Sequence, residues 1–257
     1  MNQPHPRHRT RILNPSPFMF QNIKLLYVKK LGASDGDIGH VKDFYFDDKT
    51  WLVRYLVADT GSWLSGREVL LPPHAFDTHP FGRSDADSNV LLVNLTRKQI
   101  EKSPSIDSHR PVSRQYEEDY YRYYGWSPYW EVGGMLGVAG FAVVPPPPIP
   151  MDPPHHGHNQ RDDLHLRSTK AVTGYRIQAT DGLIVSVHSF MVDGRNWAIR
   201  ELVVETGHWY AGKKILILPE NIDRISYEDS TVFVNLTKED IRQTTTNDVA
   251  QVVASRE

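Results

Sequence analysis

The chain has 257 residues, of which 39% are hydrophobic and 23% charged, so it can build one large or two small globular domains. Its formal net charge is −2, from 29 basic and 31 acidic residues, and this near balance argues against binding of DNA or RNA. It contains no cysteine, which excludes disulfides, thiolate catalysis and cysteine-ligated zinc or iron–sulfur clusters.

Two segments bear on targeting and membranes. The N-terminal residues, MNQPHPRHRTRILNPSPFMF, are basic but lack the apolar core of a signal peptide. The longest apolar stretch, GGMLGVAGFAVV, ends at four consecutive prolines and is shorter than the roughly 20 residues that a bilayer-spanning helix needs. We therefore expect no transmembrane segment and a soluble, cytoplasmic protein.

The first predicted strand lies within SDGDIGHVKDFYFDD, residues 34–48, and follows an Asp-Gly pair typical of tight turns. Its apolar residues are spaced by three, as on a helix. The flanking Gly and Asp and the FYF run nevertheless favour a strand with a bulge near Gly39. Asp47 is expected to begin the next turn, because its side chain can bond the backbone two residues on.

The next predicted strand, WLVRYLVAD, carries Arg54 between two leucines of the same strand face. An arginine on such a face needs a carboxylate or carbonyl partner. Arg54 therefore lies either in a structural ion pair or in a contact between two domains, and the sequence leaves both open. Trp51 opens this strand and is expected to be a core or rim residue.

The turn TGSWLSG places Trp63 between two strands, the second of which, REVLLPP, is ended by Pro. Trp63 is either an exposed anchor for a protein partner or a ring folded back over the end of the fold. The usual burial of Trp favours the second interpretation.

LLVNLTRKQI, residues 91–100, predicts one more strand and then a short helix, since Thr96 and Gln99 form a capping box. Short strands without crossover helices predict an antiparallel sheet. At this size we expect the sheet to close into a small barrel, which removes its edges.

A Tyr-rich helix is predicted in YEEDYYRYYGWSPYW, within the segment 105–165, and Gly125 should end it. We expect its tyrosine face to pack on one barrel or between the two. An external partner or nucleobase stacking is the alternative, and the acidic flank argues against nucleic acid. The tyrosines predicted on one face of this helix, and taken as candidate interface residues, are Tyr116, Tyr120, Tyr123 and Tyr124.

The same segment continues with PPPPIPMDPP, which predicts an extended polyproline II spacer. HHGH follows, so His155, His156 and His158 are weak candidates for a metal site. Their spacing is not that of a structural zinc site, and we expect no bound metal or cofactor.

The chain then repeats itself. Residues 34–73 align without a gap with residues 180–219, at an offset of 146, and sixteen of these 40 pairs are identical. The match resumes at VFVNLTKEDI, residues 232–241, where Thr237 and Asp240 form a weaker cap. The sequence therefore predicts two homologous domains, in which Arg200 is the counterpart of Arg54, and Trp197 and Trp209 are those of Trp51 and Trp63.

Both copies resemble the PRC-barrel domain, through the shared pattern DG–I–V–F–D–W–R–V–TG–W–G–P. That family is named for the cytoplasmic domain of the reaction-centre H subunit of purple bacteria. The resemblance implies a barrel of six-stranded type that serves as a docking or assembly module rather than as an enzyme. Unlike the H subunit, this sequence shows no N-terminal membrane anchor.

The predicted architecture is therefore mainly β, with two tandem small antiparallel barrels that each end in a short helix and are joined by the Tyr-rich helix and the proline-rich linker. We expect the barrels to pack as an internal pseudo-dimer through related surfaces that include Arg54 and Arg200. The predicted boundaries are a tail at 1–21, barrels at 22–104 and 166–246, a linker at 105–165 and a tail at 247–257.

The leading functional hypothesis is a non-catalytic protein-interaction or assembly module with an unknown partner. One alternative is an accessory role like that of the reaction-centre H subunit. Another is an unrecognised enzyme or small-ligand-binding protein, because a single sequence shows no nucleophile–base motif or phosphate loop but also cannot show residues brought together in space.

Overall fold

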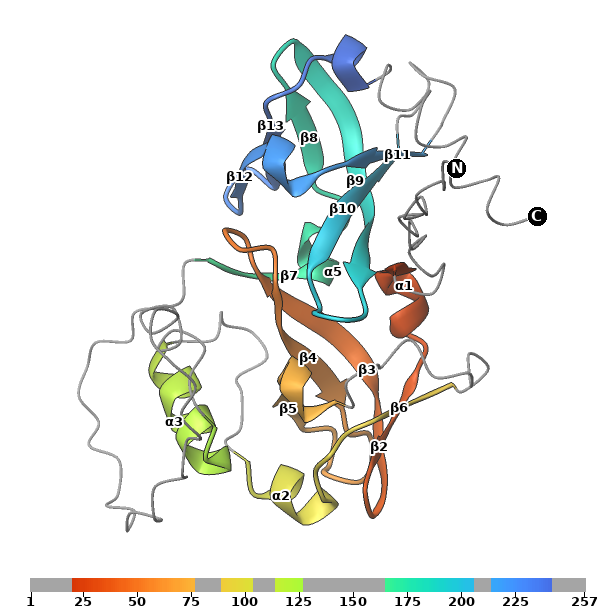
Figure 1. Cartoon of the computed structure of the whole chain (residues 1–257), viewed down its shortest axis with the longest axis vertical. Coiled ribbons are helices and arrows are strands. Elements are labelled where there is room, and N and C mark those ends of the chain that lie inside the picture. Colours follow the sequence, from red (N-terminus) through yellow and green to blue (C-terminus); the bar gives the residue numbers. More distant parts are fainter. Residues whose placement is uncertain (1–19, 77–88, 104–113, 127–164, 206–213, 242–257) are drawn as a thin grey trace, which may run out of the picture.

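A computed structural model describes residues 20–76, 89–103, 114–126, 165–205 and 214–241. The described chain is mainly β and forms two sheets, the first from the N-terminal half and the second from the C-terminal half (Figure 1). Short helices lie at the outer ends of the sheets and at the junction between them, and one longer helix lies beside the first (Figure 1).

The first sheet has the strand order β5-β4-β3-β2-β6, and β7 also pairs with β3. All of these pairs are antiparallel except β2 with β6, which is parallel, so the expectation of a purely antiparallel sheet is wrong at that pair. Its elements are β2 (Lys30–Ala33), β3 (Gly36–Asp47), β4 (Val53–Asp59), β5 (Glu68–Leu71), the 3₁₀ helix η1 (Pro73–Ala75), β6 (Val90–Leu92) and α2 (Arg97–Glu101).

Local sequence signals of the first sheet are confirmed. The register of β2 against β3 shifts by one residue at Gly39, where the bulge was predicted. The Asp47 side chain accepts hydrogen bonds from the backbone N–H groups of Lys49 and Thr50, at 3.0 and 2.8 Å, and thereby holds the turn after β3. The predicted capping box of Thr96 and Gln99 starts α2.

The second sheet repeats this arrangement and adds one strand, β12, in the order β11-β10-β9-β8-β13-β12, with β1 also paired to β9. Its parallel pair, β8 with β13, corresponds to β2 with β6. Its elements are α5 (Thr169–Val172), β8 (Arg176–Ala179), β9 (Gly182–Asp193), β10 (Ile199–Glu205), β11 (Lys214–Ile217), the 3₁₀ helix η3 (Pro219–Asn221), β12 (Ile222–Ser226) and β13 (Thr231–Val234).

The two sheets exchange short strands. β1 (Phe20–Asn22) precedes the first sheet in the chain but pairs with β9 of the second, from Phe20 opposite Asp193 to Asn22 opposite Met191. β7 (Leu166–Ser168) precedes the second sheet but pairs with β3 of the first, from Leu166 opposite Asp47 to Ser168 opposite Tyr45. The two pairings involve corresponding residues of the two repeats, which are 146 positions apart, so the exchange is reciprocal.

A direct backbone bridge lies between the sheets, where Leu52 pairs antiparallel with Ala198. The N–H of Val53 donates to the carbonyl oxygen of Trp197 at 3.0 Å, and the N–H of Ile199 donates to that of Trp51 at 2.7 Å. Because the two bonds are related by the repeat offset, an approximate two-fold axis passes through this bridge.

Both tryptophans at the bridge have left-handed backbone conformations, with φ of 58° at Trp51 and 59° at Trp197. Such a conformation is uncommon for a bulky residue and costs roughly 1–3 kcal/mol. Each ring is nevertheless buried, in agreement with the prediction of core residues. The burial of the ring and the hydrogen bond at the carbonyl oxygen of each tryptophan offset that strain.

One continuous hydrophobic core runs through both sheets. Phe46 of β3 packs against Phe190 of β9, with ring centroids 5.6 Å apart, and Phe44 packs against Trp197 at 6.2 Å. The residues that meet across the junction are therefore apolar and aromatic, and they bury the related faces of the two sheets against each other.

The prediction of closed barrels is wrong for the described residues. In the first sheet β5 and β6 stand at opposite ends of the strand order, and a single bridge between Phe76 and Val93 links the chain segments beyond them. The consecutive prolines at 72 and 73 lead into η1, because proline lacks an N–H group and has a fixed φ that suits a helix start. The strand ladder stops there and the sheet stays open.

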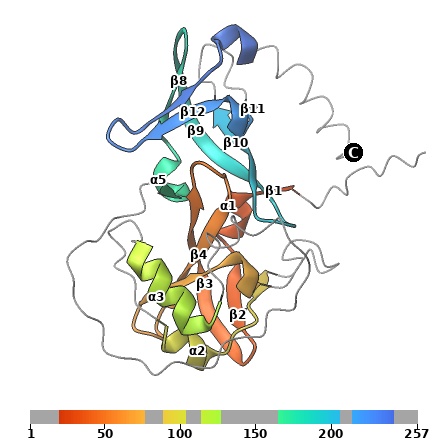
Figure 2. The same ribbon diagram turned by 60° about the vertical axis from the view of Figure 1, so that its left-hand side comes forward.

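α3 (Arg114–Tyr124) packs on the first sheet, and both views place it beside that sheet and away from the second (Figures 1 and 2). Tyr120 and Tyr121 form a small core with Tyr55, Val57 and Leu70. The helix ends at Gly125, whose φ of 69° is left-handed. Of the two predicted placements, on one unit or between the two, the structure shows the first.

Candidate interaction site beside Trp63

The turn between β4 and β5 holds Trp63 in a fixed position. The hydroxyl of Thr60 donates to the carbonyl oxygen of Arg67 at 2.7 Å, and the N–H of Gly66 donates to that of Gly61 at 2.6 Å. Gly61 and Gly66 have positive φ values of 53° and 75°, which explains why glycine occupies both positions. The Trp63 ring is half-buried against the core, so the structure combines both sequence interpretations of this residue.

Arg97, the first residue of α2, covers one face of the Trp63 ring. Its guanidinium carbon lies 4.6 Å from the ring centroid, which is within the range of a cation–π interaction. Its backbone N–H donates to Oδ1 of Asp35 at 2.7 Å and ties α2 to the start of β3. This hydrogen bond joins two residues that are 62 positions apart in the chain, and it fixes the backbone position of Arg97.

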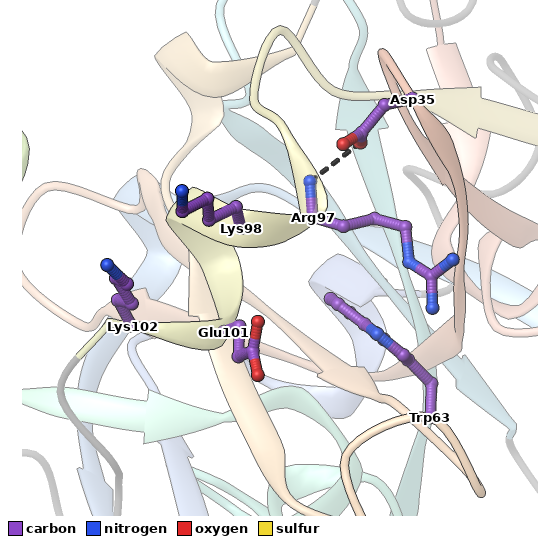
Figure 3. A pocket seen from close by; sticks show the side chains of 6 residues that line it. All are labelled: Asp35, Trp63, Arg97, Lys98, Glu101 and Lys102. Atoms are coloured by element: carbon purple, nitrogen blue, oxygen red, sulfur yellow. Dashed lines mark hydrogen bonds between the residues drawn. The ribbon is translucent and has the colours of Figure 1, made fainter.

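Trp63 and α2 line an open hollow of about 640 Å³ (Figure 3). The side chains of Arg97 and Glu101 extend from α2 toward Trp63, whereas Lys98 and Lys102 extend away along the helix (Figure 3). The lining residues are Asp35, Trp63, Arg97, Lys98, Glu101 and Lys102.

Arg67 anchors the far end of α2. Its guanidinium donates to the carbonyl oxygens of Glu101 at 2.9 Å and of Ser103 at 2.7 Å, so it caps the C-terminal end of the helix. Arg67 lies just after the Trp63 turn. The turn and the helix are therefore held together at both ends, and the hollow between them is preformed.

The two arginines predicted at a domain contact lie in ion pairs within their own sheets. Arg54 Nη2 is 3.4 Å from Oδ2 of Asp47, and Arg200 Nη2 is 3.4 Å from Oδ2 of Asp193. The Arg54 side chain is 12% exposed and that of Arg200 is 46% exposed. Each arginine thus supports the turn that leads to a bridge tryptophan, which favours the structural interpretation.

These aspartates have lowered pKa values. At Asp47 burial opposes the ionised form, but hydrogen bonds from Thr50 and Lys49 and the charge of Arg54 outweigh it and lower the pKa. At Asp193 the hydrogen bond from Arg195 is the main cause of the lowered pKa, and Arg200 adds to it. Both turns are therefore held by ionised carboxylates.

The predicted tyrosine face differs from the observed one. Tyr120 is fully buried, and its hydroxyl donates to the carbonyl oxygen of Leu70, so it cannot reach a partner. Tyr121 is buried as well, whereas Tyr123 is partly exposed and its hydroxyl donates to the carbonyl oxygen of Gln99 at 3.0 Å. Tyr124 stacks on Trp126, with ring centroids 4.3 Å apart.

The sequence did not indicate the contact that Glu117 makes. This residue lies in the first turn of α3, where its charge suits the helix dipole. It is fully buried there, and the Tyr55 hydroxyl donates to its Oε1 at 2.7 Å. Burial and the neighbouring Glu117 charge raise the pKa of Tyr55 well above its usual value. Only the position of Tyr55 on the outward face of β4 could have pointed to this contact.

Several predicted residues fall outside the described part of the chain: Trp209, the side chain of Tyr116, and His155, His156 and His158. Within the described ranges, no group of three or more histidine, aspartate or glutamate residues could hold a metal ion. No helix among the described elements is long and apolar enough to cross a membrane.

Comparison with known proteins finds a family for the first sheet. Residues 31–100 match the PRC-barrel domain family, and the chain therefore contains one PRC-barrel domain in its N-terminal half. An uncharacterised protein of Deinococcus radiodurans is 36% identical over 69 residues, which is 27% of this chain and 23% of that protein. The chain thus spans about a quarter of the length of this relative.

Proposed function

We propose that this chain is a non-catalytic assembly module, in which two tandem PRC-barrel-type units pack as an internal pseudo-dimer and the first unit docks a protein partner beside Trp63. The observation that carries the proposal is the reciprocal exchange of β1 and β7 about the bridge between Leu52 and Ala198. This junction uses the related faces of the two units for each other. The outer corners, such as the hollow beside Trp63, are then what the module presents to a partner.

Support for a second PRC-barrel-type unit comes from the matched strand order, the matched parallel pair and the left-handed Trp197 opposite Trp51. A shared order of five strands with the same strained residue at the same place is what a tandem duplication produces. Support for docking comes from the hollow, which is open and lined by charged side chains around one aromatic ring. Such surfaces suit protein segments better than small enclosed ligands.

The pseudo-dimer is tested by a disulfide across the bridge. Leu52 and Ala198 form a pair without mutual hydrogen bonds, and in such pairs the Cα atoms lie about 4.5 Å apart, within disulfide range. The natural chain has no cysteine, so the double variant Leu52→Cys/Ala198→Cys gives a clean background. We expect quantitative intramolecular oxidation, read by thiol titration and by gel mobility. A pair that stays reduced, or that links only different molecules, would contradict the junction.

Docking is tested by site-specific photo-crosslinking in cells of the native host. Benzoylphenylalanine replaces the exposed Lys98 at the hollow, and in the control chain it replaces Tyr227, which is 72% exposed on the second unit. We expect one reproducible crosslinked protein from position 98 that is missing from position 227. Equal crosslinks from both positions, or none from position 98, would remove the support for a docking site there.

A further inference from the structure

We propose that the hollow beside Trp63 binds an acidic segment of the partner protein, with a carboxylate at Arg97 and an apolar side chain against Trp63. This inference rests on the proposed function, in which a partner docks at this corner. It adds the chemistry of that partner.

Arg97 is positioned for a ligand that the chain itself does not supply. Its guanidinium lies over Trp63, yet within the described residues its side chain makes no hydrogen bond or ion pair, and its Nε atom is buried without a partner. Arg54, by contrast, meets Asp47 in the same sheet. A guanidinium that packs over an aromatic ring and has no carboxylate of its own can pair with one from a ligand, at little further cost in side-chain entropy.

The surrounding charges favour carboxylates that are spaced along a peptide. Lys98 and Lys102 are exposed on the same short helix and provide two more cations. Asp35 is already engaged by the Arg97 N–H group, which leaves Glu101 as the one acidic group of the lining without such a bond in the described chain. The lining therefore holds three cationic and two anionic side chains.

This composition distinguishes a protein segment from other anions. A nucleic acid or an anionic lipid surface presents densely spaced phosphates, which Asp35 and Glu101 in the same wall would repel. The net charge of −2 adds no long-range attraction for such polyanions. A peptide can instead place single carboxylates at the cations and an apolar residue on the remaining Trp63 surface.

The second unit offers a matched control. At the positions of Arg97, Lys98 and Gln99 it has Lys238, Glu239 and Asp240, so a lysine of the first unit is replaced by a glutamate. Lys238 makes the same backbone bond to Asp181, at 3.0 Å, as Arg97 makes to Asp35. The two units thus share this backbone contact and differ in charge at the next position.

The test is fluorescence anisotropy with the full-length protein. The probe is a short fluorescein-labelled peptide of glutamates around a single phenylalanine, and the matched peptide has glutamine in place of glutamate. The variants are Arg97→Lys, Trp63→Leu and Lys98→Glu/Lys102→Glu, with Glu239→Lys as the control in the second unit. Circular dichroism establishes that each variant is folded.

We expect saturable binding of the glutamate peptide, weakened roughly fivefold or more by Lys98→Glu/Lys102→Glu, since each surface ion pair contributes up to about 1 kcal/mol. Arg97→Lys and Trp63→Leu should weaken the binding as well. The first variant removes the planar guanidinium, and the second removes the aromatic ring on which it packs. Glu239→Lys should leave it unchanged, and added salt should reduce it.

Equal binding of the glutamine peptide, or unaltered binding by the charge-reversal variant, would overturn the proposal. Tighter binding of inorganic phosphate, oligothymidylate or phosphatidylglycerol vesicles would also overturn it and would identify a phosphate ligand. If crosslinking from position 98 finds a partner that the glutamate peptide does not displace, the inference about chemistry fails while the docking function stands.

Discussion

The first and second sheets place a tryptophan, Trp51 or Trp197, at the same left-handed position, with φ of 58° and 59°, and start the preceding turn with the same aspartate. Outside the junction they differ. Tyr55 on the outer face of β4 corresponds to Glu201 in β10, and Lys98 corresponds to Glu239. At the junction the bridge tryptophans are identical, but Leu52 corresponds to Ala198. At the two outward positions the residues also differ in charge.

The difference at the outer face has a visible cause. In the first sheet α3 brings Glu117 to Tyr55, so a carboxylate from outside the sheet meets a strand tyrosine. In the second sheet the strand itself carries the carboxylate, at Glu201. One unit has therefore become adapted to a helix of its own chain. Corresponding strands of the two sheets can thus carry different outer surfaces.

The largest expected effect is at Gly39, whose counterpart in the second unit is Val185. At Gly39 φ is 126° and a Cβ atom would lie 1.9 Å from the carbonyl oxygen of Asp59. Gly39→Val should lower the free energy of unfolding by roughly 3–6 kcal/mol, from backbone strain and overpacking combined. Urea denaturation measures it, and Val185→Gly should cost far less. If Gly39→Val is as stable as the wild type, then β3 can tolerate a side chain at this position, as β9 does at Val185.

The bridge tryptophans should give the next largest effect. Trp197→Ala removes a buried ring that packs on Phe44 and Phe76 of the other sheet, and should cost roughly 3–5 kcal/mol. Trp197→Gly loses the same ring but relieves the left-handed strain, so it should be no less stable than Trp197→Ala. Thermal and urea unfolding of both variants check this order. If Trp197→Gly is clearly less stable than Trp197→Ala, the backbone strain assigned to this residue is wrong.

The contact of α3 is tested by Tyr55→Phe, which removes the hydroxyl that donates to the buried Glu117 carboxylate. Because that carboxylate then loses a buried donor, we expect a loss of about 1–3 kcal/mol in the stability of the first sheet with α3. Hydrogen exchange should report faster opening of α3 than in the wild type. Tyr227→Phe, at an exposed position, is the control, and an equal response of both variants would contradict the role of the contact.

The smallest effect concerns pH. The pKa values of Asp47 and Asp193 are lowered in the folded protein, so their contribution is present above the unfolded value of about 3.9 and is lost as the pH falls toward their folded values. Asp193 has two arginine partners, Arg195 and Arg200, whereas Asp47 has Arg54.

Asp193→Asn keeps the turn but loses the charge, so it should flatten the acid limb of the stability–pH curve more than Asp47→Asn does. Unfolding midpoints between pH 6 and pH 2 measure this. An acid limb that neither substitution changes would show that other carboxylates control acid unfolding.

Much of the local structure could be predicted from the sequence. The bulge at Gly39, the turn at Asp47, the capping box at Thr96 and the stop at Gly125 each depend on a few neighbouring residues, and all four are confirmed. The internal repeat also predicted which strands would correspond. These signals are local or repeated, so no knowledge of long-range packing was needed.

The long-range features could not be predicted. The exchange of β1 and β7 involves segments of three residues each, too short for any periodic pattern. The burial of Glu117 depends on where Tyr55 lies in space, and the stacking of Arg97 on Trp63 joins a turn to a helix through tertiary structure. Barrel closure was expected because edges are unfavourable, but the sheets meet each other and α3 instead.

The exchanged strands also constrain how the protein is made. Asn22 donates a hydrogen bond to Ser189, 167 residues later in the chain, so β1 leaves the ribosome long before its partner strand exists. The first sheet in turn receives β7 only after the whole linker has been synthesised. The first sheet cannot complete its hydrogen bonding before the second half of the chain is translated. Final folding must therefore wait for most of the chain, and an early stop would leave the first sheet without one of its strands.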